Sequence, residues 1–140
     1  MENRLQQEQG RVVWSASHDA YKNQEPYAAL RRNLAWQKQE RDIEIKDQVQ
    51  PGQPVLVELF FHLHPECAVD RIECGFILSR SNARVELYAD SRLKAEVFHG
   101  SESPLAGWYF PRFNEIRPCY TLRCQGTVEG YTTLTSTLRV

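Results

Sequence analysis

Two histidines separated by one residue, His62 and His64, have a type and spacing that could do chemistry. Alternate side chains of a strand share a face, so both imidazoles would point the same way and could bind one Zn²⁺. A zinc site needs a third or fourth ligand, for which Glu58 is the nearest candidate on that face. No complete ligand set is visible, so we favour two histidines that hydrogen-bond at the rim of a sheet and keep both as metal candidates.

A dense aromatic run occupies Gly107–Phe113. Trp and Tyr stack on sugar rings, and Arg donates in a fork to carboxylate or sulfate, so Trp108, Tyr109 and Arg112 are candidates for carbohydrate contact. Aromatic residues and Arg are also enriched where proteins dock, so the same residues are candidates for domain docking. The third interpretation is a core strand in which Arg112 pairs with a loop acid such as Glu115.

The segment His18–Tyr21 brings a His, an Asp and a Tyr together. No nucleophile accompanies them, and adjacent residues of a strand point to opposite faces. We interpret the segment as a strand end that runs into a turn. The chain has no Ser/His/Asp order and no Gly-rich phosphate loop, so we assign it no catalytic residue.

Composition limits the class of protein. The chain has 140 residues, of which 41% are hydrophobic, enough for one domain with one core. Its 17 basic and 18 acidic residues form no basic block, so nucleic acid is not an expected partner. No apolar stretch approaches the roughly 20 residues of a membrane-spanning helix, so no membrane partner is expected. Residues 1–10 lack the apolar centre of a signal peptide; a periplasmic or secreted location would need a signal further upstream.

The four cysteines do not have the spacing of a zinc knuckle. Cys67 and Cys74 are separated by six residues, and Cys119 and Cys124 by four. Free Cys is among the most buried residue types, so we favour core thiols. A disulfide stays open as an alternative in an oxidising compartment.

The pattern along the chain predicts an all-β fold, an antiparallel β-sandwich of two packed sheets. Residues 1–10 are polar and Gln-rich and are expected to be a flexible lead-in; residues 11–140 form the single domain. Many short apolar runs punctuated by turn residues are typical of sandwiches and barrels. The predicted strands are Arg11–Ser17, Ala28–Gln37, Asp42–Gln48, Val55–His64, Ala68–Glu73, Phe76–Ser79, Arg84–Ala89, Leu93–His99, Ala106–Phe110, Cys119–Gln125 and Tyr131–Arg139.

One hairpin register can be derived from the side chains. Folding the chain about Gln39 and Glu40 sets apolar residues opposite apolar residues, and it sets Arg32 opposite Asp47, as cross-strand pairing prefers. We therefore predict Arg32 and Asp47 as an inward-facing structural pair. Gln-Glu is not a usual two-residue hairpin loop, but a four-residue loop keeps the same register. The predicted pairs are Trp36 with Ile43, Leu34 with Ile45, Arg32 with Asp47 and Leu30 with Val49.

A second hairpin is expected around Asp90–Arg92. It would place two neighbouring strands of one sheet side by side. Its facing residues would be Val85, Leu87 and Ala89 against Val97, Ala95 and Leu93.

Five motifs in order resemble the C-terminal domain of heparinase II/III-like polysaccharide lyases. The family patterns are similar to H-D-G-Y, H-R-R, a strand ending in Asp, F-H-L-H-P and G-W-Y-S-P-R-Y. The resemblance extends over about residues 11–140. Three departures, Ala20 for Gly, Asn33 after the Arg pair and Phe110 for a small residue, leave substrate preference open. The matching segments are Ser17–Tyr21, Leu30–Leu34, Ile43–Asp47, Val57–Pro65 and Gly107–Phe113.

The resemblance implies a parent lyase with an α/α-toroid followed by a β-sandwich. Such enzymes cleave uronate-containing, heparin-, heparan- or alginate-like glycans by β-elimination, with reacting groups mainly in the toroid and a divalent metal site in strands that precede those matched here. We therefore expect a non-catalytic portion, inactive alone and without its own cofactor, that supports the toroid and walls the substrate cleft. Its expected partners are the upstream toroid of the same polypeptide and an acidic polysaccharide. The alternatives are a free-standing carbohydrate-binding module and a protein-interaction domain.

Overall fold

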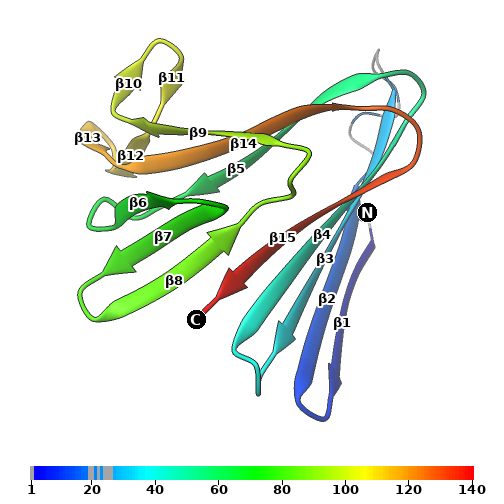
Figure 1. The fold of residues 1–140 in the computed structure, drawn as a ribbon. Coiled ribbons are helices and arrows are strands. Elements are labelled where there is room, and N and C mark those ends of the chain that lie inside the picture. Colours follow the sequence, from blue (N-terminus) through cyan, green and yellow to red (C-terminus); the bar gives the residue numbers. More distant parts are fainter. Residues whose placement is uncertain (1, 19–20, 22, 24–26) are drawn as a thin grey trace.

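The computed structural model describes residues 2–18, 21, 23 and 27–140, which form an all-β fold (Figure 1). This confirms the predicted fold class. In the described part of the chain, no helix is long and apolar enough to cross a membrane. The strands are β1 (Glu2–Glu8), β2 (Arg11–His18), β3 (Ala28–Gln37), β4 (Asp42–Pro51), β5 (Val55–His62), β6 (Ala68–Ile72), β7 (Gly75–Arg80), β8 (Ala83–Tyr88), β9 (Lys94–His99), β10 (Ser101–Glu102), β11 (Leu105–Ala106), β12 (Trp108–Arg112), β13 (Glu115–Pro118), β14 (Tyr120–Val128) and β15 (Thr132–Arg139).

Two antiparallel sheets form the layers. The large sheet has eight strands in the order β1-β2-β3-β4-β15-β8-β7-β6, and the small sheet has three in the order β5-β14-β9. Two short hairpins, β10–β11 and β12–β13, lie at one end of the small sheet (Figure 1). The large sheet therefore extends well beyond the area that three strands can cover.

Alternation along the strands explains how the layers pack. In β5, Val55 and Leu59 are buried, whereas Leu56 and Phe60 on the opposite face are exposed. Successive side chains of a strand point to opposite faces, so one face of β5 joins the core and the other faces outward.

The core lies over only part of the large sheet. One cluster joins Val49 of β4 and Leu134 of β15 to Leu59 and Cys124 of the small sheet. A second cluster joins Phe76, Leu87 and Leu122. Burial of a Leu or Phe side chain stabilises a fold by about 1.5–3 kcal/mol. Neither cluster contains a residue of β1 or β2, so the core is centred on β4, β15, β8 and β7.

The register predicted for the first hairpin is confirmed. Strands β3 and β4 pair with Arg32 opposite Asp47, Leu34 opposite Ile45 and Trp36 opposite Ile43. Gln37 pairs with Asp42, so four residues form the loop, and Arg41 takes a φ of 59° there. Local side-chain complementarity therefore determined this pairing, and the loop adapted to it.

The prediction of a flexible lead-in at residues 1–10 is wrong. Glu2–Glu8 forms the edge strand β1, which pairs with β2 so that Leu5 lies opposite Trp14. Gly10 turns the chain with a φ of 80°, a backbone conformation that glycine adopts without steric cost. An edge strand exposes polar side chains to water, so its composition resembles that of a loop.

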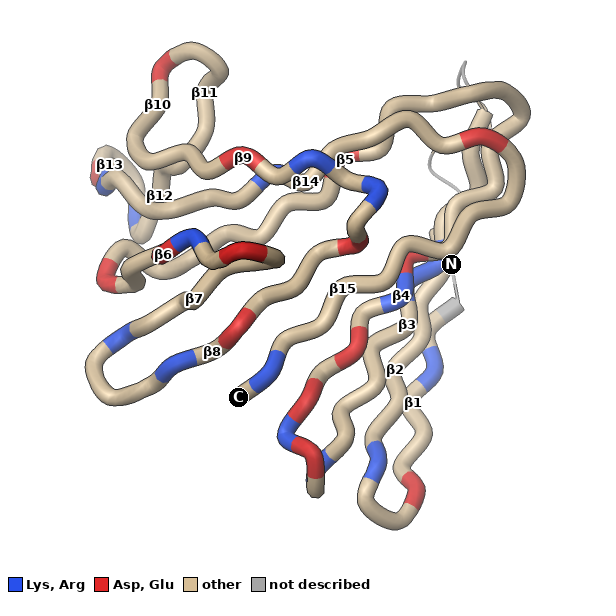
Figure 2. The backbone as a smooth tube through the Cα atoms, viewed as in Figure 1, with Lys and Arg blue, Asp and Glu red and all other residues tan. Residues whose placement is uncertain are grey.

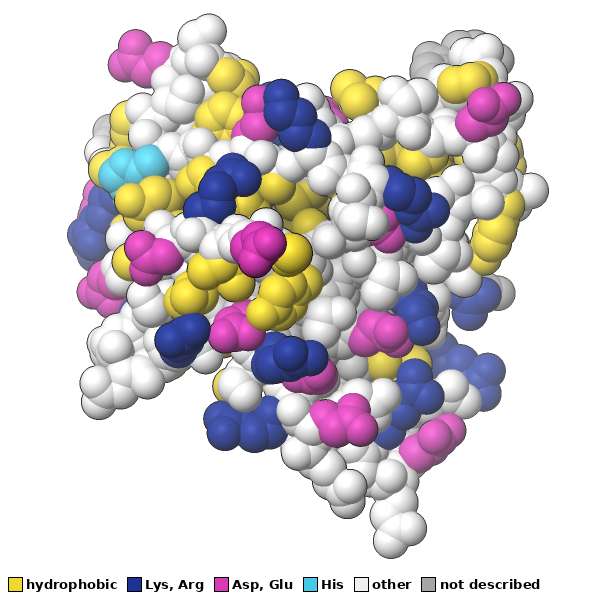
Figure 3. Space-filling view, in the orientation of Figure 1, with side chains coloured by type: hydrophobic (Ala, Val, Ile, Leu, Met, Phe, Trp, Pro, Cys, Tyr) yellow, Lys and Arg dark blue, Asp and Glu magenta, His cyan; other side chains and the backbone are white. Residues whose placement is uncertain are grey.

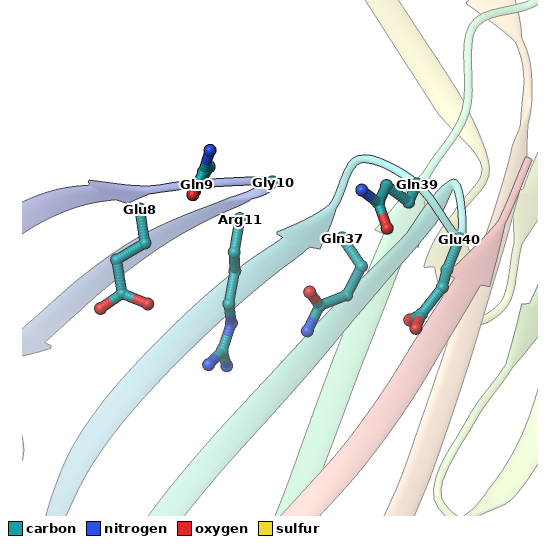
Figure 4. A pocket seen from close by; sticks show the side chains of 7 residues that line it. All are labelled: Glu8, Gln9, Gly10, Arg11, Gln37, Gln39 and Glu40. Carbon is teal, nitrogen blue, oxygen red and sulfur yellow. The ribbon is translucent and has the colours of Figure 1, made fainter.

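The tips of the β1–β2 and β3–β4 hairpins meet beside a polar pocket (Figure 4). Lys38 N donates to Gly10 O at 2.9 Å, which ties the β1–β2 turn to the loop after β3. The pocket lining is polar, and no sequence motif pointed to it. Its residues are Glu8, Gln9, Gly10, Arg11, Gln37, Gln39 and Glu40.

The expected second hairpin around Asp90–Arg92 is also wrong. Strand β8 pairs with β7 and β15, whereas β9 pairs with β14, so the chain crosses here from one sheet to the other. The Asp90 carboxylate accepts hydrogen bonds from Thr135 N at 2.8 Å and from the Arg92 guanidinium at 2.7 Å. These bonds anchor the crossover to β15, 45 residues further along the chain.

We predict that Asp90→Asn destabilises the fold at neutral pH. The Arg92 guanidinium, and then the Thr135 N–H group, hold the pKa of Asp90 well below its ordinary value. Because the folded-state pKa is depressed, this stabilisation is present above the ordinary pKa and is lost as pH falls toward the folded value. Hydrogen bonds to charged groups contribute about 1.5–3 kcal/mol, so a loss of that size is expected at pH 7 by urea unfolding.

The difference between wild type and Asp90→Asn should shrink at about pH 3, below the ordinary carboxyl pKa. Glu66→Gln is the control, because Glu66 pairs with Arg80 in a largely exposed ion pair. A difference that stays constant between the two pH values would contradict the assigned role of the Asp90 carboxylate.

Candidate functional site

A cleft lies where the inner face of β2–β4 meets β5. Four of the five sequence motifs supply residues to its lining, through His18, Arg32, Asp47 and Glu58. These residues come from four different strands or strand ends, so the fold brings together what the sequence separates. Other lining residues are Trp14, Ala16, Leu30, Val49, Val57 and Leu59.

The sheet register positions the central pair of this cleft. Ala16 on β2 lies opposite Arg32, and Arg32 lies opposite Asp47 on β4, so all three share one face. Arg32 Nε donates to Asp47 Oδ1 at 2.6 Å, and Arg32 Nη2 donates to Oδ2 at 2.9 Å. This bidentate geometry is the strong form of an Arg–carboxylate interaction.

The two partners differ in exposure. The Asp47 side chain is 12% exposed and that of Arg32 is 44% exposed. A buried carboxylate is tolerated only when it is paired with an opposite charge and hydrogen-bonded. Arg32 is both the charge partner and the hydrogen-bond donor of Asp47. The cleft therefore presents the edge of a guanidinium, whose charge Asp47 balances, and not an unpaired carboxylate base.

His18 ends β2, as the sequence predicted, and lies at the rim of the cleft. Its ring centroid is 5.6 Å from that of Tyr21, with the planes tilted by 56°. Asp19 and Ala20 of the same motif lie outside the described residues. The described part of the motif is a His–Tyr contact at a strand end.

His62 and His64 lie at the end of β5 and just beyond it. The His62 ring stacks on Phe60, and its Nδ1 lies 3.2 Å from Thr121 Oγ1. His64 packs against Tyr109 with ring centroids 5.6 Å apart, so the fourth and fifth motifs meet here. Among residues 2–18, 21, 23 and 27–140, no three His, Cys, Asp or Glu side chains gather to hold a metal ion.

Glu58, the expected third ligand, has a different partner. Arg123 donates to Glu58 at 3.3 Å and to Glu96 at 2.7 Å, and its guanidinium lies 5.0 Å from the Phe98 ring centroid. The nearby Arg123 guanidinium lowers the pKa of Glu96. Arg123 was not identified from the sequence, because its partners come from β5 and β9 and not from its own strand.

The aromatic motif begins with a glycine that no other residue can replace easily. Gly107 has a φ of 79°, and a Cβ there would lie 2.8 Å from Cys119 O. Its own carbonyl accepts bonds from Gly100 N and Cys119 N. The predicted strand Ala106–Phe110 is therefore divided here into β11 and β12.

The three aromatic-motif candidates have different environments. Trp108 is half-buried, and its Nε1 donates to Ser101 O at 2.9 Å, which fixes the neighbouring β10–β11 hairpin. Tyr109 and Arg112 reach the surface, and Arg112 pairs with Glu115 at 3.0 Å, the partner that one sequence interpretation expected. Tyr109 and Arg112 are thus better placed than Trp108 to contact another molecule.

The four cysteines are free thiols, and they divide by burial. Cys119 and Cys124 are buried, Cys67 is half-buried and Cys74 is exposed. Burial raises the pKa of the Cys124 thiol. The expectation of core thiols thus holds for Cys119 and Cys124.

Charges of both signs are interspersed along the strands and over the face seen in the space-filling view (Figures 2 and 3). Many of them are paired locally, as in Lys46 with Glu44 and Arg139 with Asp42. A polyanion held by counterion release needs a concentration of basic side chains, which this face does not present.

Comparisons with known proteins agree with this geometry. The family described as "Heparinase II/III-like, C-terminal" matches residues 2–137. The chain is similar to the crystal structure of heparan sulfate lyase HepC from Pedobacter heparinus, with a TM-score of 0.76 and 9% identity over 98% of this chain. It is also similar to a heparinase III gene product, with a TM-score of 0.72 and 13% identity over 99% of this chain. The chain covers 21% of each of those two proteins. No curated protein sequence matches it significantly.

We predict that Arg32→Met and Asp47→Leu each lower the free energy of unfolding. The sum of these two losses should exceed the loss in the double variant. Each single change leaves a partly buried charge unpaired, whereas the double change removes both charges. Because Arg32 is half-exposed, we expect a coupling of about 1–3 kcal/mol, below that of a fully buried pair. Urea unfolding of all four proteins measures it.

The exposed pair of Arg80 and Glu66 is the control for this cycle, because the two guanidinium–carboxylate contacts are 2.6 and 2.9 Å but both side chains reach water. Its coupling should be about 0–1 kcal/mol. Equal coupling energies in the two cycles would contradict the prediction, because they would show that burial of Asp47 adds nothing to the coupling energy of the pair.

Proposed function

Because the chain belongs to the heparinase II/III-like C-terminal family, we propose that it is the non-catalytic β-sandwich portion of a polysaccharide lyase. The observation that carries the proposal is the family match over residues 2–137, essentially the whole chain. The domain would brace an α/α-toroid of the same polypeptide and form one wall of its substrate cleft. The substrate class would be uronate-containing glycans of the heparin, heparan or alginate kind.

The length of the similar structures supports a division of labour. The chain spans about a fifth of the two lyases it resembles in fold, so most of each of those proteins lies in other regions. In the proposed enzyme, the larger remaining part supplies the catalytic groups. A divalent metal, if the whole enzyme uses one, would be held by residues outside this chain.

The chemistry of elimination also supports this division. A base must remove the proton α to the uronate carboxyl, an acid must protonate the leaving oxygen, and the carboxyl charge must be neutralised. In the described cleft, Asp47 is held by Arg32, and Glu58 is held by Arg123. The proposed role of this wall is to shape the cleft, with Tyr109 and Arg112 as candidates for glycan contact or domain docking.

An absorbance assay tests the proposal. Elimination creates a C=C bond conjugated to the uronate carboxyl, so product formation raises ultraviolet absorbance. We expect a rise when heparan sulfate or alginate is mixed with the polypeptide of the whole reading frame, and none with residues 1–140 alone. Dextran, which has no uronate carboxyl, is the control substrate and should give no rise with either protein.

Turnover by residues 1–140 alone would overturn the non-catalytic role, and a reading frame that starts at Met1 would overturn the same-polypeptide toroid. A titration of tryptophan fluorescence with the same glycans tests the alternative of a free-standing binding module. Saturable binding to residues 1–140 that Tyr109→Ala or Arg112→Ala abolishes, with folding intact, would favour that module.

A further inference from the structure

The inner face of β1–β4 carries a continuous apolar surface beyond the core. Leu5 lies opposite Trp14, and Trp14 lies opposite Leu34, which gives one apolar row across three strands. A second row runs through Val12, Trp36 and Ile43. We call these six residues, Leu5, Val12, Trp14, Leu34, Trp36 and Ile43, the open face.

The register shows which side of the sheet the open face occupies. Ile43 and Val49 are six residues apart on β4, so their side chains point to the same side, and Val49 belongs to the core. The opposite side of these strands is polar, with Ser15 bonded to Asn33 at 2.6 Å and Lys46 paired with Glu44 at 2.8 Å. The polar side faces water, and the open face therefore continues the buried layer of the sandwich.

No strand of the small sheet contributes to a core over this half of the large sheet in the described residues. Leu5 is 68% exposed and Trp36 is 47% exposed, although both lie on the side that forms the core elsewhere. Contiguous exposed apolar surface on one sheet face marks an interaction site. Lys38 lies over the Trp36 ring at 5.5 Å, so the rim of this surface is cationic.

We infer that the open face is the docking surface for the remaining part of the proposed lyase polypeptide, which would continue the second layer of the sandwich over β1–β4. This inference rests on the proposed function. Two observations favour this occupant: the open face lies on the same side of the sheet as the core residues Leu30 and Val49, beyond the Arg32–Asp47 pair, and the similar lyases are about five times as long as this chain. The occupant would bring apolar side chains to Trp36 and an acceptor group to Lys38.

Hydroxyl-radical footprinting tests the inference without changing the protein. The polypeptide of the whole reading frame and residues 1–140 alone are oxidised under equal conditions. We expect Leu5 and Trp36 to react at least about fivefold more slowly in the whole polypeptide, because a docked layer excludes water from them. Leu56 is the matched control, since it is 63% exposed on the outward face of β5; its rate should change less than about twofold.

Matched variants give a second readout in the whole polypeptide. Leu5→Glu should lower the midpoint of thermal unfolding by about 3 °C or more, because it introduces a charge into an apolar contact. Leu56→Glu should shift that midpoint by less than about 1 °C. In residues 1–140 alone, both variants should keep the wild-type circular dichroism spectrum, which shows that neither change unfolds the domain itself.

Unchanged reactivity of Leu5 and Trp36, or equal protection of Leu5 and Leu56, would overturn the docking surface. A dimer of residues 1–140 in light scattering that Leu5→Glu dissociates would assign the open face to a second copy and overturn the proposed occupant. The lyase assay separates this inference from the proposed function. An active polypeptide in which Leu5 stays reactive removes the docking surface alone, and an inactive one in which Leu5 is protected removes the lyase function alone.

Discussion

The ion pair between Arg32 and Asp47 lies where the large sheet changes from covered core to open face, and the register of β3 on β4 depends on it. Asp47 is 12% exposed, so its charge is tolerated only with a guanidinium at bonding distance. A slip of one residue in β4 would move Asp47 together with Ile45 and Val49 from the core side to the outward side of the sheet. The exposure of Ile45 and Val49 and the loss of the Arg32–Asp47 contact both oppose that slip. The pair therefore selects one register in a hairpin whose loop has little preference of its own.

This local complementarity explains which parts of the fold could be predicted. The pairing of β3 with β4 could be derived because both strands and their partners lie within one stretch of sequence. The crossover after β8 could not, because Asp90 is held by Thr135 on a strand that comes much later in the chain. A hairpin and a crossover between sheets have the same turn residues, so only the distant partner distinguishes them. The edge strand β1 was missed for a related reason, since its polar side chains carry the pattern of a loop while its backbone pairs with β2.

The candidate site shows the same limit at the level of side chains. Sequence identified residue types that could bind metal or sugar, but their partners decide what they do. The sequence allowed Glu58 as a metal ligand and Trp108 as a stacking residue. In the structure, Arg123 of β14 donates to Glu58, and the Trp108 indole nitrogen donates to Ser101 O. Both partners lie on other strands, and neither belongs to a recognisable motif. The convergence of His18, Arg32 and Asp47 on one cleft was in contrast foreseeable in part, because two of the three were already paired by register.

The alternation of side chains that builds the core also leaves an apolar side of β1–β4 without a second layer. Side chains alternate over the whole of a strand once the register is fixed, so the inner side of β1–β4 extends beyond the part that the small sheet covers. The outward side of β2–β4 carries polar residues, and Ser15 donates to Asn33 there. The inner side of the same strands retains Trp14 and Trp36, the largest apolar side chains available. Two tryptophans on the uncovered half of a sheet are costly to leave in water and become favourable when another layer packs on them. The wide large sheet and narrow small sheet are therefore consistent with a domain that completes its second layer with a partner, and the proposed lyase would provide that partner within one polypeptide.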